Sequence, residues 1–102
     1  LPEVTAWSVD HASSRYADCA RAMDVATIAD SDESACAQLV DALHALTTDL
    51  QVPGPRAFGI DRAIWFDSLE LMATQALDSG SPANNPRVPV AQDIVRLYER
   101  IW

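Results

Sequence analysis

The stretch Ser31–Leu50, SDESACAQLVDALHALTTDL, decides the fold of this 102-residue chain. Ser31 and the two acidic residues after it place a cap and negative charge where the first backbone N–H groups of a helix are unpaired. Apolar residues then recur at intervals of three and four, as one stripe about four turns long, made of Cys36, Leu39, Leu43, Leu46 and Leu50. The stretch therefore predicts an amphipathic helix, and the segment VPGP at 52–55 ends it.

Three further helices follow from the same periodicity. One begins near Ser13 or Ser14, which offer N-caps, one runs from Asp67 or Ser68 to Gly80, and one runs from Val90 to Trp102. Their apolar faces are predicted to be, in that order, Tyr16, Cys19, Ala20 and Met23; Leu69, Met72, Ala73, Ala76 and Leu77; and Ile94, Leu97, Tyr98 and Ile101.

The segments between these helices are expected to be loops. Residues 24–31, 56–60 and 79–89 are rich in turn-forming residues, with Phe58 and Ile60 expected to point inward, and 61–66 forms at most a short turn. No stretch alternates apolar and polar residues as a strand would. The fold class is therefore all-α, a small helical bundle. A domain this small is marginally stable. Trp7 and Trp65 are expected to be exposed, and together with the start at Leu1 they suggest apolar surface that faces missing protein.

The charge of the chain restricts its partners. The net charge is −8, and all seven basic residues are scattered arginines. Such a surface repels nucleic acid and anionic membranes, so neither is expected as a partner. No apolar run approaches the ~20 residues of a membrane-spanning helix. The first residues form no signal peptide, and a start at Leu1 suggests a start within a longer protein. We expect a soluble, cytoplasmic protein.

No catalytic or metal-ligating residue is visible in the sequence. His11 and His44 lack further ligands nearby, although Asp41 could share a helix face with His44, and both histidines are expected to be solvated. Cys19 and Cys36 match no metal or redox motif and are expected to be small buried side chains, with a disulfide between them as the less supported alternative. The loop SGSPANNPR at 79–87 is either a structural corner or the wall of a binding cleft, and its residues alone favour the corner.

Several motifs, in their order along the whole chain, resemble the iron-containing (group III) alcohol dehydrogenases. Residues 83–102, ANNPRVPVAQDIVRLYERIW, resemble the family's C-terminus, in which an N-P-R loop precedes an acidic D-I or E-I pair and a last helix. Upstream, LPEV at 1–4, YADCARAM at 16–23 and LQVP at 50–53 resemble the family's L-P-x-V, Y-x-x-x-A-R-x-M/L and leucine-glycine-hydrophobic-proline elements. Ser8 replaces a frequent asparagine. Val90 replaces a Thr or Ser cap, at a cost of ~1 kcal/mol unless Asp93 or water compensates.

The resemblance implies that residues 1–102 are the C-terminal portion of a dehydroquinate synthase-like helical domain. The nucleotide-binding domain and the metal ligands, one aspartate and three histidines, would then precede Leu1. Fe²⁺, sometimes Zn²⁺, would polarise the oxygen of a small alcohol or aldehyde while hydride passes to or from NAD(P). This chain would depend on the missing N-terminal part of the enzyme, would be inactive alone, and would belong to a homo-oligomer.

The resemblance also assigns roles within the 79–87 loop. Ser81 and Pro82 are expected to line the substrate pocket, whereas Asn85, Pro86 and Arg87 are expected to hold the corner, Arg87 through a bidentate pair with a carboxylate. The alternative interpretation belongs to a different class of protein: a stand-alone acidic helical domain whose exposed tryptophans bind a protein partner.

Overall fold

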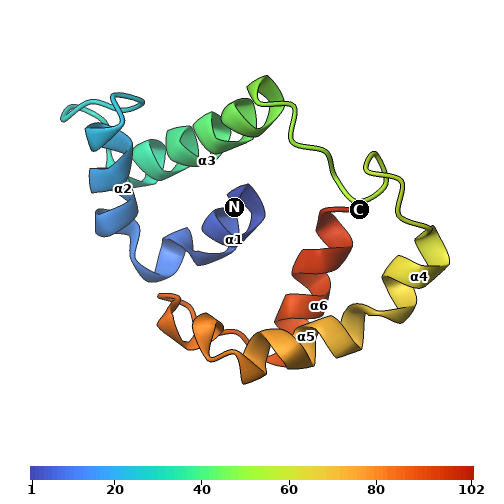
Figure 1. Ribbon diagram of the computed structural model, residues 1–102. Helices are drawn as coiled ribbons and strands as arrows, with labels where there is room; N and C mark the ends of the chain where they lie inside the picture. The colour runs from blue at the N-terminus through green and yellow to red at the C-terminus, as the bar shows by residue number, and fades with distance from the viewer. The chain divides into compact units, whose positions relative to one another are not determined.

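A computed structural model describes all 102 residues, and every regular element in it is helical (Figure 1). The prediction of an all-α chain is confirmed. The chain divides into two compact units, residues 1–52 (unit 1) and 53–102 (unit 2). No helix is both long enough and apolar enough to cross a membrane. The elements are α1 Pro2–Ser8, η1 Val9–His11, α2 Ser13–Ala22, α3 Asp32–Asp49, α4 Arg62–Asp67, α5 Leu69–Asp78, η2 Ser81–Asn84 and α6 Ala91–Arg100.

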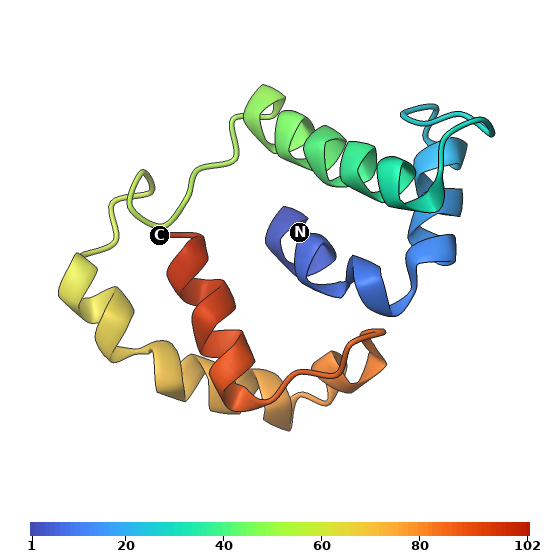
Figure 2. The same cartoon turned by 180° about the vertical axis from the view of Figure 1, so that it is seen from behind.

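In unit 1, α3 packs against α2 and α1, as both views of the ribbon show (Figures 1 and 2). Ala17 and Ala20 of α2 and Ala35 of α3 are fully buried in the core. Side chains this small let two helix backbones approach closely, because no larger group stands between them. Leu39 and Leu43 complete the contact from α3, and each buried leucine contributes about 1.5–3 kcal/mol.

Helix α3 follows the prediction in its bounds and its cap, but not in the burial of its apolar stripe. The Ser31 hydroxyl accepts a hydrogen bond from the backbone N–H of Ser34 (3.2 Å), which confirms the predicted cap. Of the predicted stripe, Cys36, Leu39 and Leu43 are buried, whereas Leu46 and Leu50 are 47% and 67% exposed. The apolar stripe is thus longer than the core that covers it.

Helix α1 is an element that the sequence analysis missed. Pro2 occupies its first turn, where a missing N–H costs nothing, and the backbone N–H of Thr5 donates to the Leu1 carbonyl. Ser8, at the family's frequent asparagine position, is completely buried, and its hydroxyl donates to the Val4 carbonyl (2.7 Å). A seven-residue helix is too short to show a clear apolar period.

Helix α2 confirms the predicted helix but not the predicted cap or the whole apolar face. Ser13 and Ser14 lie inside its first turn, and no side chain caps it. The buried residues are Ala17 and Ala20, while Cys19 is exposed, so its predicted burial is wrong. Met23 is also largely exposed, because the chain leaves the helix there.

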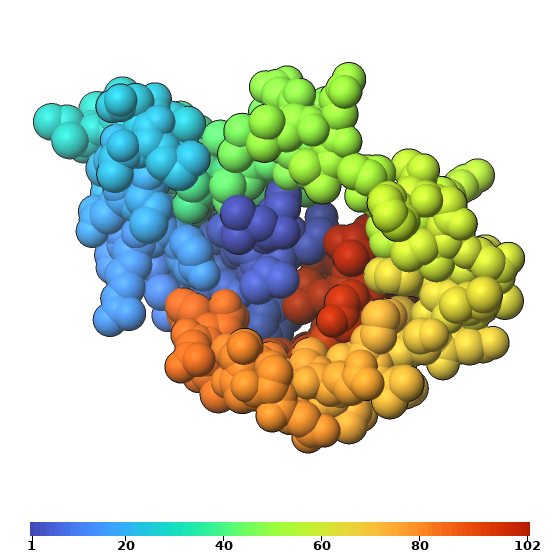
Figure 3. Space-filling view, viewed as in Figure 1, coloured from blue at the N-terminus to red at the C-terminus, as the bar shows by residue number.

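One arginine fastens the loop between α2 and α3, which projects from unit 1 (cyan in Figure 3). The Arg21 guanidinium donates to the carbonyls of Thr27 (3.3 Å) and Asp30 (3.0 Å) and to the Asp32 carboxylate (2.8 Å). Within the loop, the Asp30 carboxylate accepts from the Thr27 N–H and hydroxyl, and these bonds lower the pKa of Asp30. The predicted loop over 24–31 is confirmed, with Ile28 almost entirely in solvent.

The chain leaves α3 through a residue in the left-handed conformation. Gln51 has a φ of 53°, and the Val52 N–H reaches back to the Thr47 carbonyl. Glycine adopts this conformation without strain, whereas a side chain makes it unfavourable. The geometry therefore gives a physical reason for glycine at this place in the family's leucine-glycine-hydrophobic-proline turn.

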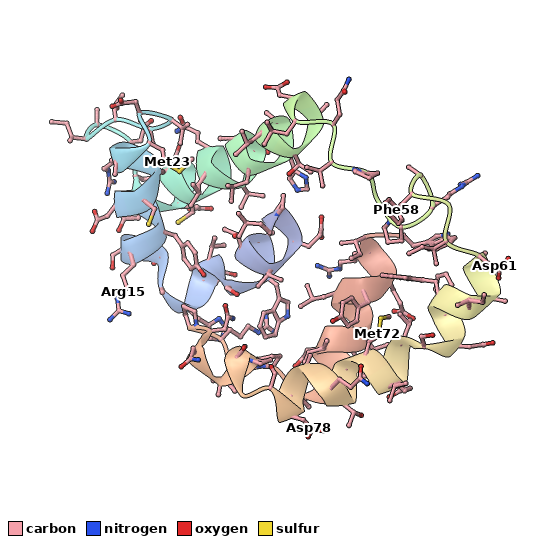
Figure 4. The ribbon with its side chains drawn as sticks, viewed as in Figure 1. Arg15, Met23, Phe58, Asp61, Met72 and Asp78 are labelled. Atoms are coloured by element: carbon pink, nitrogen blue, oxygen red, sulfur yellow. The ribbon has the colours of Figure 1, made fainter.

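Unit 2 is built around an aromatic cluster between α4, α5 and α6. Trp65 lies within 6.0 Å of both the Tyr98 and the Trp102 ring centroids, and Phe66 packs on Trp102 at 5.7 Å. Met72 of α5 is directed toward α6 (Figure 4). The predicted exposure of Trp65 is therefore wrong: only 9% of it is exposed, and its indole N–H is buried without a hydrogen-bond partner. Trp7, in unit 1, is half-buried.

The segment before α5 also differs from the prediction. Residues 62–67 form the helix α4 instead of a short turn, because the Asp61 carboxylate accepts from the N–H groups of Ala63 and Ile64 (Figure 4). Ile60 packs on the core of unit 2 as expected. Phe58 is 74% exposed, so its predicted inward position is wrong.

Helices α5 and α6 agree with the prediction in most of their packed faces, but Leu77 and Ile101 are exposed, and Val95, which was not predicted, is buried. Leu69 and Ala73 of α5 and Ile94 of α6 are buried against each other in one core. Gly80, with a φ of 74°, ends the region of α5 as predicted. At α6, the carboxylate of Asp93 accepts a hydrogen bond from the Val90 N–H (3.1 Å). Asp93 therefore supplies the compensation expected for the missing Thr or Ser cap.

The Arg21 contacts predict how the loop responds to substitution. Replacing Arg21→Ala removes the donors that hold two loop carbonyls, and Arg21→Lys replaces a planar fork with a single ammonium. We expect both variants to show a lower Tm and faster amide exchange at Thr27 and Asp30, with Arg21→Lys only partly recovering the loss. Arg15→Ala, at an arginine directed away from unit 1 (Figure 4), is the matched control.

The same loop should respond to acid in a defined direction. Because the pKa of Asp30 is lowered in the folded state, its contribution to stability is present above the unfolded carboxyl pKa and is lost as the pH falls through the lower folded value. For the Arg21 variants, the contradicting result is also defined. If the loop amides exchange at the same rate in the wild type and in both Arg21 variants, Arg21 does not hold the loop in place.

The conformation of Gln51 predicts that Gln51→Gly stabilises unit 1. Removing a side chain from a left-handed residue should raise the free energy of unfolding by roughly 1 kcal/mol, measured by urea denaturation. The control is Gln75→Gly on the exposed side of α5, where glycine should lower stability by about 1 kcal/mol. A loss of stability in both variants would show that Gln51 is not strained.

Candidate functional site

Ser81 and Pro82, which the sequence predicts to line the pocket, lie in the short 3-10 helix η2. Gly80 directs the chain out of α5, and η2 holds Ser81 exposed and Pro82 half-buried. The side-chain amide of Asn85 donates to the carbonyl of Arg87 (2.6 Å), which closes the loop on itself. The two predicted groups therefore lie on one small structure, with Ser81 and Pro82 in the turn and Asn85 to Arg87 in the segment after it.

The histidines and cysteines of the chain do not come together. No group of three or more His, Cys, Asp or Glu side chains has an arrangement that could hold a metal ion. The nearest partner of the His44 imidazole is Glu3, with Nε2 and Oε1 3.7 Å apart, instead of Asp41 on the same helix. Cys36 is buried and Cys19 is exposed, and both are free thiols.

A groove of about 510 Å³ lies entirely within unit 1. One wall is the first half of α3, and the other comes from α1, η1 and the start of α2. Apolar side chains provide much of its lining, and Ser13 adds a hydroxyl; the apolar residues are Ala6, Val9, Cys36, Ala37 and Val40. Four carboxylates join them: Asp10, Asp32, Glu33 and Asp41.

The chemistry of this groove favours binding over catalysis. Burial raises the pKa of the Cys36 thiol, and the carboxylates of Asp32 and Asp10 raise it further against the opposing effect of Arg21. The thiol also donates to the Ser13 carbonyl (3.3 Å), so it stays protonated and unreactive at neutral pH. No lysine, arginine or histidine lines the groove, so it has no group to hold an anion.

No motif in the sequence marks this groove. Its carboxylates come from two elements, η1 and α3, that lie more than twenty residues apart in the chain, and a helical spacing relates only the residues on α3. The uneven distribution of charge along the sequence could have indicated an acidic surface in unit 1. Residues 1–52 carry nine carboxylates and two arginines, whereas residues 53–102 carry six carboxylates and five arginines.

Comparison with known proteins gives the family. The model of the Fe-containing alcohol dehydrogenase family, C-terminal, matches residues 1–102. The chain is 33% identical over 103 aligned residues to the lactaldehyde reductases of Escherichia coli strains K12 and O157:H7, with all of this chain covered. It spans 26% of the length of these relatives. No solved structure matches the chain significantly. The chain therefore belongs to the Fe-containing alcohol dehydrogenase family, and its match is to the C-terminal region of that family.

Proposed function

We propose that residues 1–102 are the C-terminal helical part of an iron-dependent, NAD(P)-linked alcohol dehydrogenase or aldehyde reductase. The observation that carries the proposal is the match of the whole chain to the C-terminal family model. The substrate is a small alcohol or aldehyde. Lactaldehyde is the first aldehyde to test, because the relatives at 33% identity are lactaldehyde reductases.

The metal and the nucleotide belong, in this proposal, to polypeptide outside residues 1–102. The side chains of this chain do not fit a metal ion, because no three potential ligands converge. A bound Fe²⁺ or Zn²⁺ supplies Lewis-acid polarisation of a carbonyl or alcohol oxygen. The present residues take no part in that step, and the chain alone is inactive.

The contribution of this chain is one wall of the substrate pocket. Ser81 and Pro82 are held in place by the turn after Gly80 and by the Asn85–Arg87 hydrogen bond. A serine and a proline fixed by a 3-10 turn present a small, rigid surface, which suits a site for a small substrate. Asn85, Pro86 and Arg87 hold the corner behind them.

The surface of the chain supports a role within a larger protein. Fourteen large hydrophobic side chains are exposed, among them Ile28 at 95% and Leu50 at 67%. Surface of this kind is usually covered by other protein. The remaining part of the same enzyme is the proposed partner, in a cytoplasmic homo-oligomer. The stand-alone interaction domain is not favoured, since one of its two binding tryptophans, Trp65, is buried.

The proposal predicts the activity of two proteins. The full-length enzyme, loaded with Fe²⁺ or Zn²⁺, should oxidise NADH or NADPH with lactaldehyde or another short aldehyde, as followed by cofactor absorbance. The 102-residue chain under the same conditions should show no turnover and no stoichiometric metal. An inactive full-length enzyme with proper metal occupancy across a panel of short alcohols and aldehydes would contradict the proposal.

A substitution tests the pocket wall in the full-length enzyme. Ser81→Phe places a bulky ring where the small side chain lines the site, and it should raise KM for the aldehyde roughly tenfold, about 1.4 kcal/mol of substrate binding. Ser14→Phe, at an exposed serine of α2, is the control and should leave KM unchanged. Equal KM values in the two variants would show that Ser81 does not line the substrate pocket.

A further inference from the structure

We propose that the groove of unit 1 is the docking site of a cationic amphipathic helix that belongs to the rest of the same enzyme. The inference rests on the proposed function in one respect, that the chain is part of a longer polypeptide. It adds the place of the contact and the chemistry of the segment that fills it.

The lining of the groove suits a helix. Its α3 wall follows successive turns through Glu33, Ala37 and Val40, so it runs along a helix and not into a closed cavity. Ala37 is exposed and Val40 is half-buried, which leaves apolar surface open. Amphipathic helices bind such grooves by inserting residues spaced by three and four.

The charge of the groove specifies the occupant further. Asp10, Glu33 and Asp41 are exposed carboxylates at the groove, and no cation lies among the residues that line it. Covering them with a neutral apolar helix would remove water from carboxylates without replacing it, which is unfavourable. Arginine or lysine on either side of an apolar stripe would pair with them instead.

This chain does not itself supply such a helix. Residues 1–52 have nine carboxylates against two arginines, and Arg21 is already engaged by Asp32 and the loop. In unit 2, α6 carries Arg96 and Arg100, but it buries its apolar residues Ile94 and Val95 in its own core. A second copy of the chain is thus a poor occupant. The relatives are about four times as long, and that additional polypeptide is where the helix is assigned.

The test uses peptides from the enzyme's own sequence outside residues 1–102. Overlapping peptides of about twenty residues, ~30 Å when helical, are titrated onto the 102-residue chain and followed by fluorescence anisotropy. Peptides with basic residues flanking an apolar stripe should bind. The groove variant Asp10→Asn/Glu33→Gln/Asp41→Asn should weaken binding roughly tenfold or more; Asp32 is kept because it holds Arg21.

A second triple variant separates the groove from general electrostatics. Asp24→Asn/Asp67→Asn/Glu70→Gln changes the net charge equally at exposed carboxylates outside the groove, with Glu70 in the first turn of α5 as Glu33 is in that of α3, and should leave binding unchanged. Binding by no peptide, or an equal loss in both triple variants, would overturn the proposal. In the full-length enzyme, the groove variant should lower Tm more than the control, and equal Tm values would also overturn it. Neither peptide binding nor Tm depends on enzymatic turnover. Both results can therefore be interpreted even if the full-length enzyme lacks the proposed activity.

Discussion

Close contact between small side chains holds α2 against α3, and most other features of unit 1 depend on it. Five of the twelve buried hydrophobic residues of the chain are alanines. Alanine permits a short distance between helix axes but buries little apolar area, so each contact adds only a small hydrophobic free energy. Polar contacts therefore matter more than in a larger core, and Arg21 binds two loop carbonyls and the Asp32 carboxylate, which apolar packing alone would leave loose.

The family motifs of this chain mark the places where the backbone changes direction. Pro2 starts α1, Arg21 holds the loop after α2, Gln51 reverses the chain after α3, and Asp93 caps α6. None of these residues needs to contact a substrate for its identity to matter. A resemblance carried by such residues is a resemblance of fold, and the proposed reaction rests on family membership and not on side chains of this region.

The uneven distribution of charge connects the fold with the proposed role. Unit 2 is nearly balanced, and its aromatic core buries Trp65 among Tyr98 and Trp102. Unit 1 combines a large excess of carboxylates with an open apolar groove. An acidic surface that also exposes apolar side chains is well suited to a basic, apolar segment of other protein. The features from which we infer contact with further polypeptide, the excess of carboxylates and the open apolar groove, therefore belong to unit 1 and not to unit 2.

The sequence by itself determined the helical class, the extent of α3 and the loop over 24–31, and it named Asp93 as one candidate to compensate for Val90. These features depend on contacts between residues close in the chain, such as caps, turns and apolar periods. Tertiary structure decided which apolar residues are covered: Leu46, Cys19 and Phe58 are exposed, and Trp65 is buried. It also created the groove, whose carboxylates come from α3 and from η1, more than twenty residues apart. Periodicity identifies the apolar face of a helix, but only the packing of other elements determines how much of that face is buried.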